Sequence, residues 1–136
     1  MLEKDYLIRY LNALFEALQK LKNNVETSTS SGDEELKYAY ALLGGDFDFF
    51  KEMTLEDVIK FFERKNGEHL ESIHTLSRIL YYDALEQNEE DLKLQILLKS
   101  KELNDFYSQH TDAFNFVDVG FGNKVNVAIA EFKNTE

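Results

Sequence analysis

The feature that most constrains the fold is the complete absence of proline from the 136 residues of the chain. At the usual frequency of about 5%, a chain of this length would contain roughly seven prolines. Proline is costly inside helices and is common in the turns of all-β proteins. The sequence therefore favours an all-α fold.

Length and composition indicate one globular unit. A chain of 136 residues has the usual size of a single domain, and its 43% hydrophobic and 30% charged residues are typical of globular proteins. We expect a single helical domain over residues 1–136, built as a bundle or as an array of helical hairpins with five to six helices.

The chain is strongly acidic. It has 26 Asp and Glu against 15 Lys and Arg, which gives a net charge of −11. This charge repels phosphate backbones and anionic membrane surfaces, and no apolar run approaches the ~18 residues of a membrane span. We therefore expect neither nucleic acid nor membrane as a partner. The absence of cysteine excludes disulfides and suits the cytoplasm, which is the location we expect.

The first predicted helix covers residues 3–22. Leucines recur at alternating spacings of four and three residues, and the polar residues fall together on the opposite face, as in an amphipathic helix. The leucines are Leu7, Leu11, Leu14, Leu18 and Leu21, and the polar residues are Asp5, Arg9, Asn12, Glu16, Gln19 and Lys20. Residues 23–32 are polar and lack a period, so we expect a mobile loop there.

Start and stop signals divide the middle of the chain. A helix is predicted from Asp33 to the pair Gly44-Gly45, where glycine can accept the left-handed conformation. Residues 46–53, rich in phenylalanine, are then interpreted as a connection. Thr54 and Asp57 form a variant of the capping box, which predicts a helix from residue 55 to about residue 65.

Two longer helices are predicted next, over residues 68–87 and 89–109. The connection at Gln87-Asn88 is so short that the two helices must form an antiparallel hairpin. Residues 113–133 leave two alternatives, a short β-hairpin around Gly122-Asn123 or an aromatic loop followed by a helix from Asn123. Valine and isoleucine favour strands, but an isolated hairpin is marginally stable, so we favour the loop and helix.

Few residues suggest catalysis or metal binding. Glu71 and His74 have the i, i+3 spacing of helical metal ligands, but the helical wheel places Glu71 about 150° from the centre of the apolar stripe. We therefore predict an exposed polar pair. His110 lies near the end of its predicted helix, where the macrodipole favours a cation. We predict no catalytic, cofactor-binding or metal-binding residue and no cofactor.

Apolar side chains are the stronger signal. Several phenylalanines lie in predicted connections, and the helix over residues 89–109 is apolar on two sides. One side carries Leu92, Ile96, Leu103 and Phe106. The other side contributes to a candidate partner surface that consists of Leu94, Leu97, Leu98, Phe47, Phe49, Phe116 and Phe121. These residues either close the ends of the bundle and pack under another helix, or form an interface with a partner or a second copy.

The segment Glu3-Lys4-Asp5-Tyr6-Leu7-Ile8-Arg9 resembles the N-terminus of small helical bacterial proteins classed as a domain of unknown function. The resemblance covers residues 5–21 and the phenylalanine-rich segment 111–133, and it implies no catalytic residues. The helices predicted at 68–87 and 89–109 also look like a tetratricopeptide hairpin, although Leu80 and Leu92 stand where that family has Gly and Ala.

These observations favour a non-enzymatic interaction module that binds a protein partner or a second copy of itself through apolar and aromatic side chains. The alternative is a helical bundle that binds a small ligand, or acts as an enzyme, in a pocket between helices. An exposed apolar patch would favour the first function, and an enclosed polar pocket would favour the second.

Overall fold

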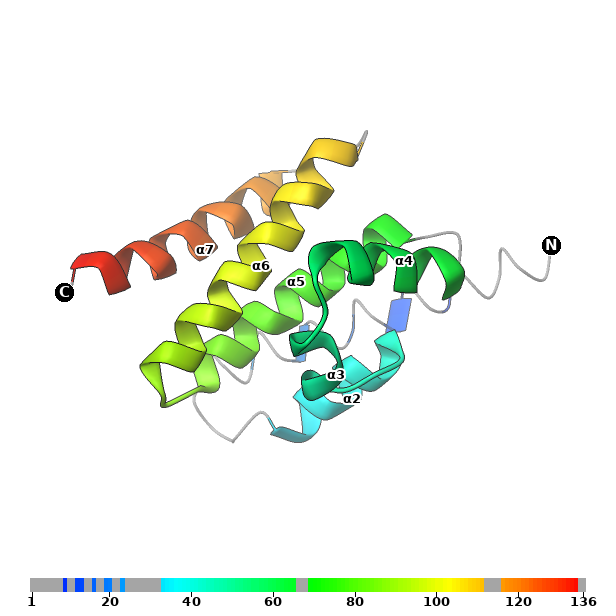
Figure 1. Ribbon diagram of the computed structural model, residues 1–136, viewed down its shortest axis with the longest axis horizontal. Helices are drawn as coiled ribbons and strands as arrows, with labels where there is room; N and C mark the ends of the chain where they lie inside the picture. The colour runs from blue at the N-terminus through cyan, green and yellow to red at the C-terminus, as the bar shows by residue number, and fades with distance from the viewer. Residues whose placement is uncertain are drawn as a thin grey trace.

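The computed structural model describes residues 33–65, 69–111 and 116–134, together with Arg9, Asn12, Ala13, Glu16, Gln19, Lys20 and Asn23. In these three ranges the chain forms six helices and no strand, which confirms the all-α prediction (Figure 1). The helices are α2 (Asp33–Leu43), α3 (Phe47–Lys51), α4 (Leu55–Lys65), α5 (His69–Glu86), α6 (Glu90–His110) and α7 (Phe116–Asn134).

The described positions before α2 agree with the helix predicted over residues 3–22. All seven are helical. The five polar residues among them that were predicted to share a face are exposed: Arg9, Asn12, Glu16, Gln19 and Lys20. The predicted leucine seam lies outside the described residues. The predicted loop over 23–32 begins no earlier than residue 24, since Asn23 is helical, and its remainder also lies outside them.

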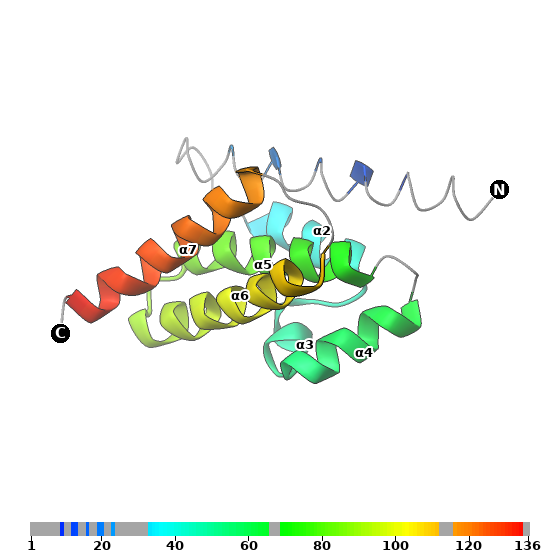
Figure 2. The ribbon, with the colours of Figure 1, turned by 90° about the horizontal axis from the view of Figure 1, so that it is seen from above.

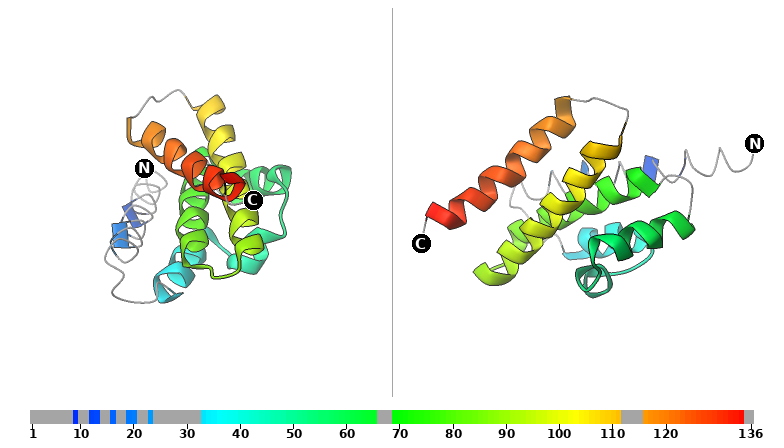
Figure 3. Two further views of the ribbon diagram at one scale, coloured as in Figure 1. Left: turned by 90° about the vertical axis from the view of Figure 1, so that its left-hand side faces the viewer. Right: turned by 45° about the horizontal axis from the view of Figure 1, so that its top comes forward.

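The centre of the molecule is the antiparallel hairpin of α5 and α6, which the short connection predicted (Figures 1 and 3). Two buried serines join the helices where they face each other. Ser77 Oγ donates to the carbonyl oxygen of Ser100 at 2.7 Å, and Ser100 Oγ donates to the carbonyl oxygen of Ser77 at 2.7 Å. These small side chains let the two backbones approach closely and satisfy their own hydrogen-bonding groups.

The remaining helices cover the hairpin from several sides. Helices α2 and α4 pack against α5, and α7 packs against α6. Helices α3 and α4 lie on the opposite side of the hairpin from α7 (Figure 2). As a result α5 is buried far beyond its predicted apolar stripe. Even its small polar residues Ser72, Thr75 and Ser77 are buried.

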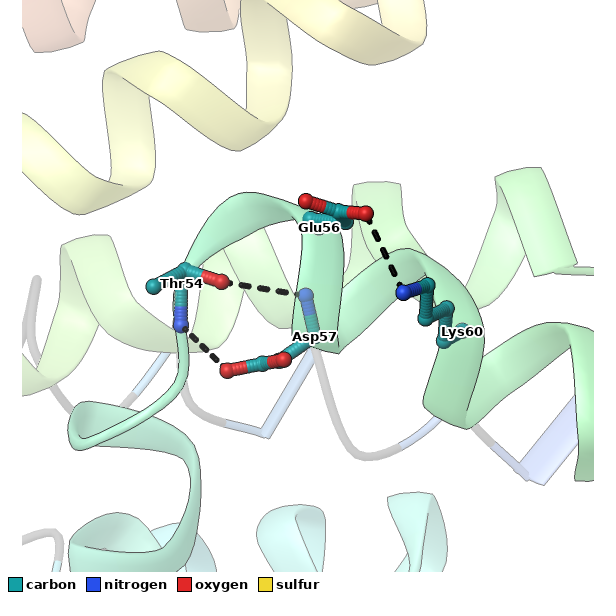
Figure 4. Close-up of polar contacts among 4 residues, drawn as sticks. All are labelled: Thr54, Glu56, Asp57 and Lys60. Atoms are coloured by element: carbon teal, nitrogen blue, oxygen red, sulfur yellow. Dashed lines mark hydrogen bonds and ion pairs between the residues drawn. The ribbon is translucent and has the colours of Figure 1, made fainter.

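The ends of α2 and α4 follow the predicted signals. Gly44 has φ 99°, the left-handed conformation for which glycine is selected after a helix. At the start of α4 the backbone N–H of Asp57 donates to Thr54 Oγ1 at 3.1 Å, and the backbone N–H of Thr54 donates to Asp57 Oδ2 at 3.3 Å (Figure 4). The aspartate therefore completes the capping box, as predicted.

The segment predicted as a connection contains the short helix α3. Asp46 caps it, because its side chain accepts a hydrogen bond from the backbone N–H of Phe49 at 2.8 Å. The helix inserts Phe50 into an aromatic cluster with Tyr40 and Phe62, with ring centroids 6.2 Å and 5.9 Å away. Phe50 is fully buried, so this part of the phenylalanine-rich segment belongs to the core.

The C-terminal segment is a single helix from residue 116, so the β-hairpin alternative is wrong. Asn123 lies inside α7 and is not its N-cap. Its buried apolar residues are Phe121, Val125 and Ile129, at the helical spacing of four. Gly122 faces α6, since a Cβ atom there would lie 3.1 Å from Asn104 Nδ2. The glycine therefore permits close helix packing.

Candidate functional site

The structure separates the predicted partner surface into buried and exposed parts. Leu97 is 0% exposed and Phe121 is 6% exposed, so neither can contact a partner in this conformation. Leu97 is buried because the inward face of α6 consists of Ile96, Leu97, Ser100, Leu103, Asn104 and Tyr107. Leu97 and Phe121 therefore follow the alternative in which these residues pack inside the bundle.

Four of the other predicted surface residues lie nearer to solvent. Leu94 is half-buried against the core. Phe116 belongs to α7, and the structure does not describe its side chain. Phe49 is 41% exposed, Leu98 is 48% exposed and Phe47 is half-buried. Phe47 and Phe49 come from α3 and Leu98 comes from α6. Phe47 and Leu98 line the same pocket, and Phe49 lines a second hollow.

A pocket of about 450 Å³ lies between α3 and α6. Its lining combines apolar side chains with charged and amide side chains, which are Phe47, Leu80, Ile96 and Leu98 on one hand and Lys51, Glu52, Gln95, Lys99 and Glu102 on the other. Phe47 and Leu98 are both predicted surface residues. The sequence did not reveal that they line the same pocket, because they are separated by 51 positions in the chain.

Lys99 fixes one wall of this pocket. Its Nζ donates to the backbone carbonyl oxygen of Lys51 at 2.8 Å and also to that of Met53. These carbonyls stand at the C-terminal end of α3, where a cation is favoured. Burial lowers the pKa of Lys99, while the negative charges of Glu102, Glu52 and Asp57 oppose this shift. Lys99 therefore ties α3 to α6, and Glu52 and Glu102 lie close to it.

A second, more open hollow of about 850 Å³ lies between α3 and α4. Its lining residues are Phe49, Glu52, Met53, Asp57, Lys60, Phe61 and Arg64. Glu52 lines both hollows, so they adjoin. Lys60 is paired with Glu56 at 3.1 Å (Figure 4). We call the region formed by Phe47, Phe49, Leu98 and the two hollows the α3 surface.

The predicted exposed pair of Glu71 and His74 is wrong. His74 is 7% exposed, and its ring centroid lies 4.0 Å from that of Tyr107 on α6. Glu71 is half-buried and accepts a hydrogen bond from Tyr107 Oη at 3.5 Å. Phe121 of α7 also contacts the histidine ring, with centroids 6.4 Å apart. The helical-wheel prediction for α5 was wrong here because α6 and α7 cover its polar side, opposite the apolar stripe.

His110 has a local contact at the end of α6. It is exposed, its Nδ1 lies 2.9 Å from the carbonyl oxygen of Phe106, and its ring stacks on the Phe106 ring at 4.1 Å. Within the described ranges, no three histidine, aspartate or glutamate side chains come together in a way that could hold a metal ion.

A buried polar network joins α2 to α5. Tyr40 Oη donates to Asp83 Oδ2 at 2.6 Å, and Gln87 Nε2 donates to Asp83 Oδ1 at 2.8 Å. Tyr40 is 2% exposed and Asp83 is 5% exposed. Burial, together with the charge of Asp83 and the hydrogen bond to it, raises the pKa of Tyr40 well above its ordinary value. The sequence alone did not reveal this network, because Tyr40 and Asp83 are 43 positions apart.

Fold and site together define an all-α helical bundle that carries a partly apolar, charge-rimmed surface around α3. Comparisons with protein-family profiles, with curated proteins and with solved structures gave no match. In the part of the chain that the structure describes, no helix has both the length and the apolar character that crossing a bilayer requires.

Proposed function

We propose that this protein is a non-enzymatic interaction module that binds a protein partner through the α3 surface. The observation that carries the proposal is the gathering of Phe47, Phe49 and Leu98 beside two adjoining hollows. Large apolar side chains that stay partly exposed within a hollowed region are typical of interaction sites, and aromatic residues are enriched where binding energy concentrates. The proposed compartment is the cytoplasm.

Site-specific photocrosslinking tests this proposal. A photoreactive phenylalanine analogue is placed at position 98, and in a control protein at position 127, where Val127 is 59% exposed on α7. We expect a discrete crosslinked protein from position 98 but not from position 127. That protein, once purified, should bind the original chain and bind a Leu98→Glu variant at least about tenfold more weakly, as expected for loss of an interface anchor.

Two outcomes contradict the proposal. Crosslinks that do not differ between positions 98 and 127 would mean that the α3 surface has no preferred partner. Crosslinks only to a second copy of the chain, together with a dimer mass in light scattering, would assign the surface to self-association.

One observation favours a second candidate function, a small-ligand carrier. The pocket of about 450 Å³ lies within the ~300–1,000 Å³ range of small-molecule sites, and Lys99 lies at its wall. Methyl NMR titration with small aromatic amines tests it, since the exposed carboxylates of the pocket lining suit a cationic ligand. Saturable shifts of the Ile96 and Leu98 methyl signals would support the carrier, whereas unchanged signals at millimolar ligand would exclude this class of ligand.

A further inference from the structure

The charges around the α3–α6 pocket are not equivalent. The ammonium of Lys99 points to the carbonyl oxygens at the end of α3 and is therefore directed into the protein. Glu52 and Glu102 are exposed, line the pocket and lie near enough to Lys99 to act on its pKa. The Nζ of Lys51 lies 5.8 Å from the centroid of the Phe47 ring. The outward-facing carboxylates thus outnumber the outward-facing ammonium group.

These two carboxylates keep their charge available to a partner. In the part of the chain that the structure describes, Lys60 pairs with Glu56 and Lys101 pairs with Asp105, and no ion pair to Glu52 or Glu102 is seen. The net charge of −11 adds a long-range field that attracts cations. Apolar side chains between two such carboxylates provide a place for an anchor residue, and the carboxylates provide partners for basic residues next to it.

We infer that the α3–α6 pocket receives an apolar side chain from a basic segment of the protein partner, with Lys or Arg of that segment placed against Glu52 and Glu102. The inference rests on the proposed function and adds the chemistry of the partner. Phe47, Ile96 and Leu98 provide the apolar contact, and the charged rim selects basic segments over acidic ones.

Defined peptides test this chemistry without knowledge of the natural partner. The probe is a capped, alanine-based peptide of about 15 residues, long enough for helix formation on binding, with two leucines on one face and arginines beside them. One matched peptide carries glutamate in place of arginine. Fluorescence anisotropy at low salt measures the binding of both peptides to the full chain.

The protein variants separate a local rim effect from the overall charge. The double variant E52Q/E102Q removes two charges at the pocket, and E34Q/E63Q removes two from exposed residues that line neither hollow. Leu98→Ser removes an apolar wall residue, and Val127→Ser is its exposed control on α7.

We expect the arginine peptide to bind and the glutamate peptide to bind at least about tenfold more weakly. E52Q/E102Q should weaken the arginine peptide by about 5- to 30-fold, the sum of two modest charge pairs, and E34Q/E63Q by less than about twofold. Leu98→Ser should weaken binding of the arginine peptide, and Val127→Ser should leave it unchanged.

Three results would overturn the inference. Equal weakening by the two double variants would mean that only the net charge attracts the peptide. Equal binding of both peptides, lost in Leu98→Ser, would remove the basic partner but leave the α3 surface as a docking site. Absence of binding by either peptide would also reject the basic segment, and the photocrosslinking result would then decide the proposed function independently.

Discussion

Replacing Tyr40 by phenylalanine removes one hydroxyl group and leaves the aromatic packing around it in place. In the native protein this hydroxyl donates to Asp83 Oδ2 at 2.6 Å, in a site where both residues are almost fully buried. A hydrogen bond to a charged acceptor contributes about 1.5–3 kcal/mol. Without the Tyr40 hydroxyl, the Asp83 carboxylate keeps only the hydrogen bond from Gln87 in this network. We expect Tyr40→Phe to lower the free energy of unfolding by about 1.5–3 kcal/mol at neutral pH.

The same pair predicts a pH dependence with a definite sign. The pKa of Tyr40 is raised in the folded protein above its ordinary value of 10.0, so the folded state resists ionisation of the phenol more than the unfolded state does. The stabilisation is complete below pH 10 and is lost as the pH rises above 10, because only the unfolded chain then releases the proton easily. Tyr40→Phe should remove this part of the alkaline destabilisation.

Urea denaturation followed by circular dichroism, at neutral pH and at several values above pH 10, measures both effects. Tyr38→Phe is the matched control, since Tyr38 is 54% exposed on the same helix and should change stability by less than about 0.5 kcal/mol. A Tyr40→Phe protein as stable as the original at neutral pH would refute the buried hydrogen bond. A difference between the two proteins that stays constant above pH 10 would refute the raised pKa.

The remaining predictions concern packing and the wall of the α3–α6 pocket. Leu97→Glu buries a charge at a fully buried position and should cost at least about 3–5 kcal/mol, whereas Leu98→Glu, half-exposed beside it, should cost less than about 1 kcal/mol in the same urea assay; similar losses would contradict the assigned inward face of α6. Lys99→Met keeps the apolar stem but removes the donor to the carbonyl oxygens of Lys51 and Met53. Hydrogen exchange of residues 47–53 should therefore accelerate while that of α5 stays slow. Unchanged exchange of residues 47–53 would show that Lys99 does not hold α3. Asp57→Ala should lower stability by about 0.5–2 kcal/mol through loss of the capping box, with Asp105→Ala at an exposed position of α6 as the control. Equal effects would mean that the capping box has no specific role.

Local signals were sufficient where the fold depends on neighbouring residues. The ends of α2 and α4 follow from Gly44 and from the pair Thr54 and Asp57, and the short connection between α5 and α6 was enough to predict their hairpin. The same approach missed α3, although Asp46 is a standard N-cap residue three positions before Phe49. The segment is so short that helix propensity is only a weak guide, and its phenylalanines favoured the interpretation as a connection.

The predicted burial of side chains was wrong where a further helix packs on a pair of helices. The wheel of α5 described one apolar stripe, but α2, α4 and α6 surround that helix, and Phe121 of α7 lies against His74. In α7, valine and isoleucine favoured strands, but the segment is a helix that packs on α6, with Gly122 facing Asn104. Such contacts join residues far apart in sequence, and no periodicity within one segment contains them.

The α3 surface depends both on local sequence and on contacts between helices. For this reason the sequence predicted its apolar residues but not their arrangement. Phe47 and Phe49 were candidates because they lie in a predicted connection, and Leu98 because it lies on the second apolar side of its helix. The same criteria also selected Leu97 and Phe121, which are buried. The contact that joins the two helices here runs from the Lys99 side chain of α6 to backbone carbonyls at the end of α3, and no pattern within one segment contains it. This contact also turns the lysine charge inward and leaves Glu52 and Glu102 on the rim. A lysine that would count as a basic surface residue in the sequence therefore donates its hydrogen bonds to the backbone of α3 and offers fewer of them to a partner.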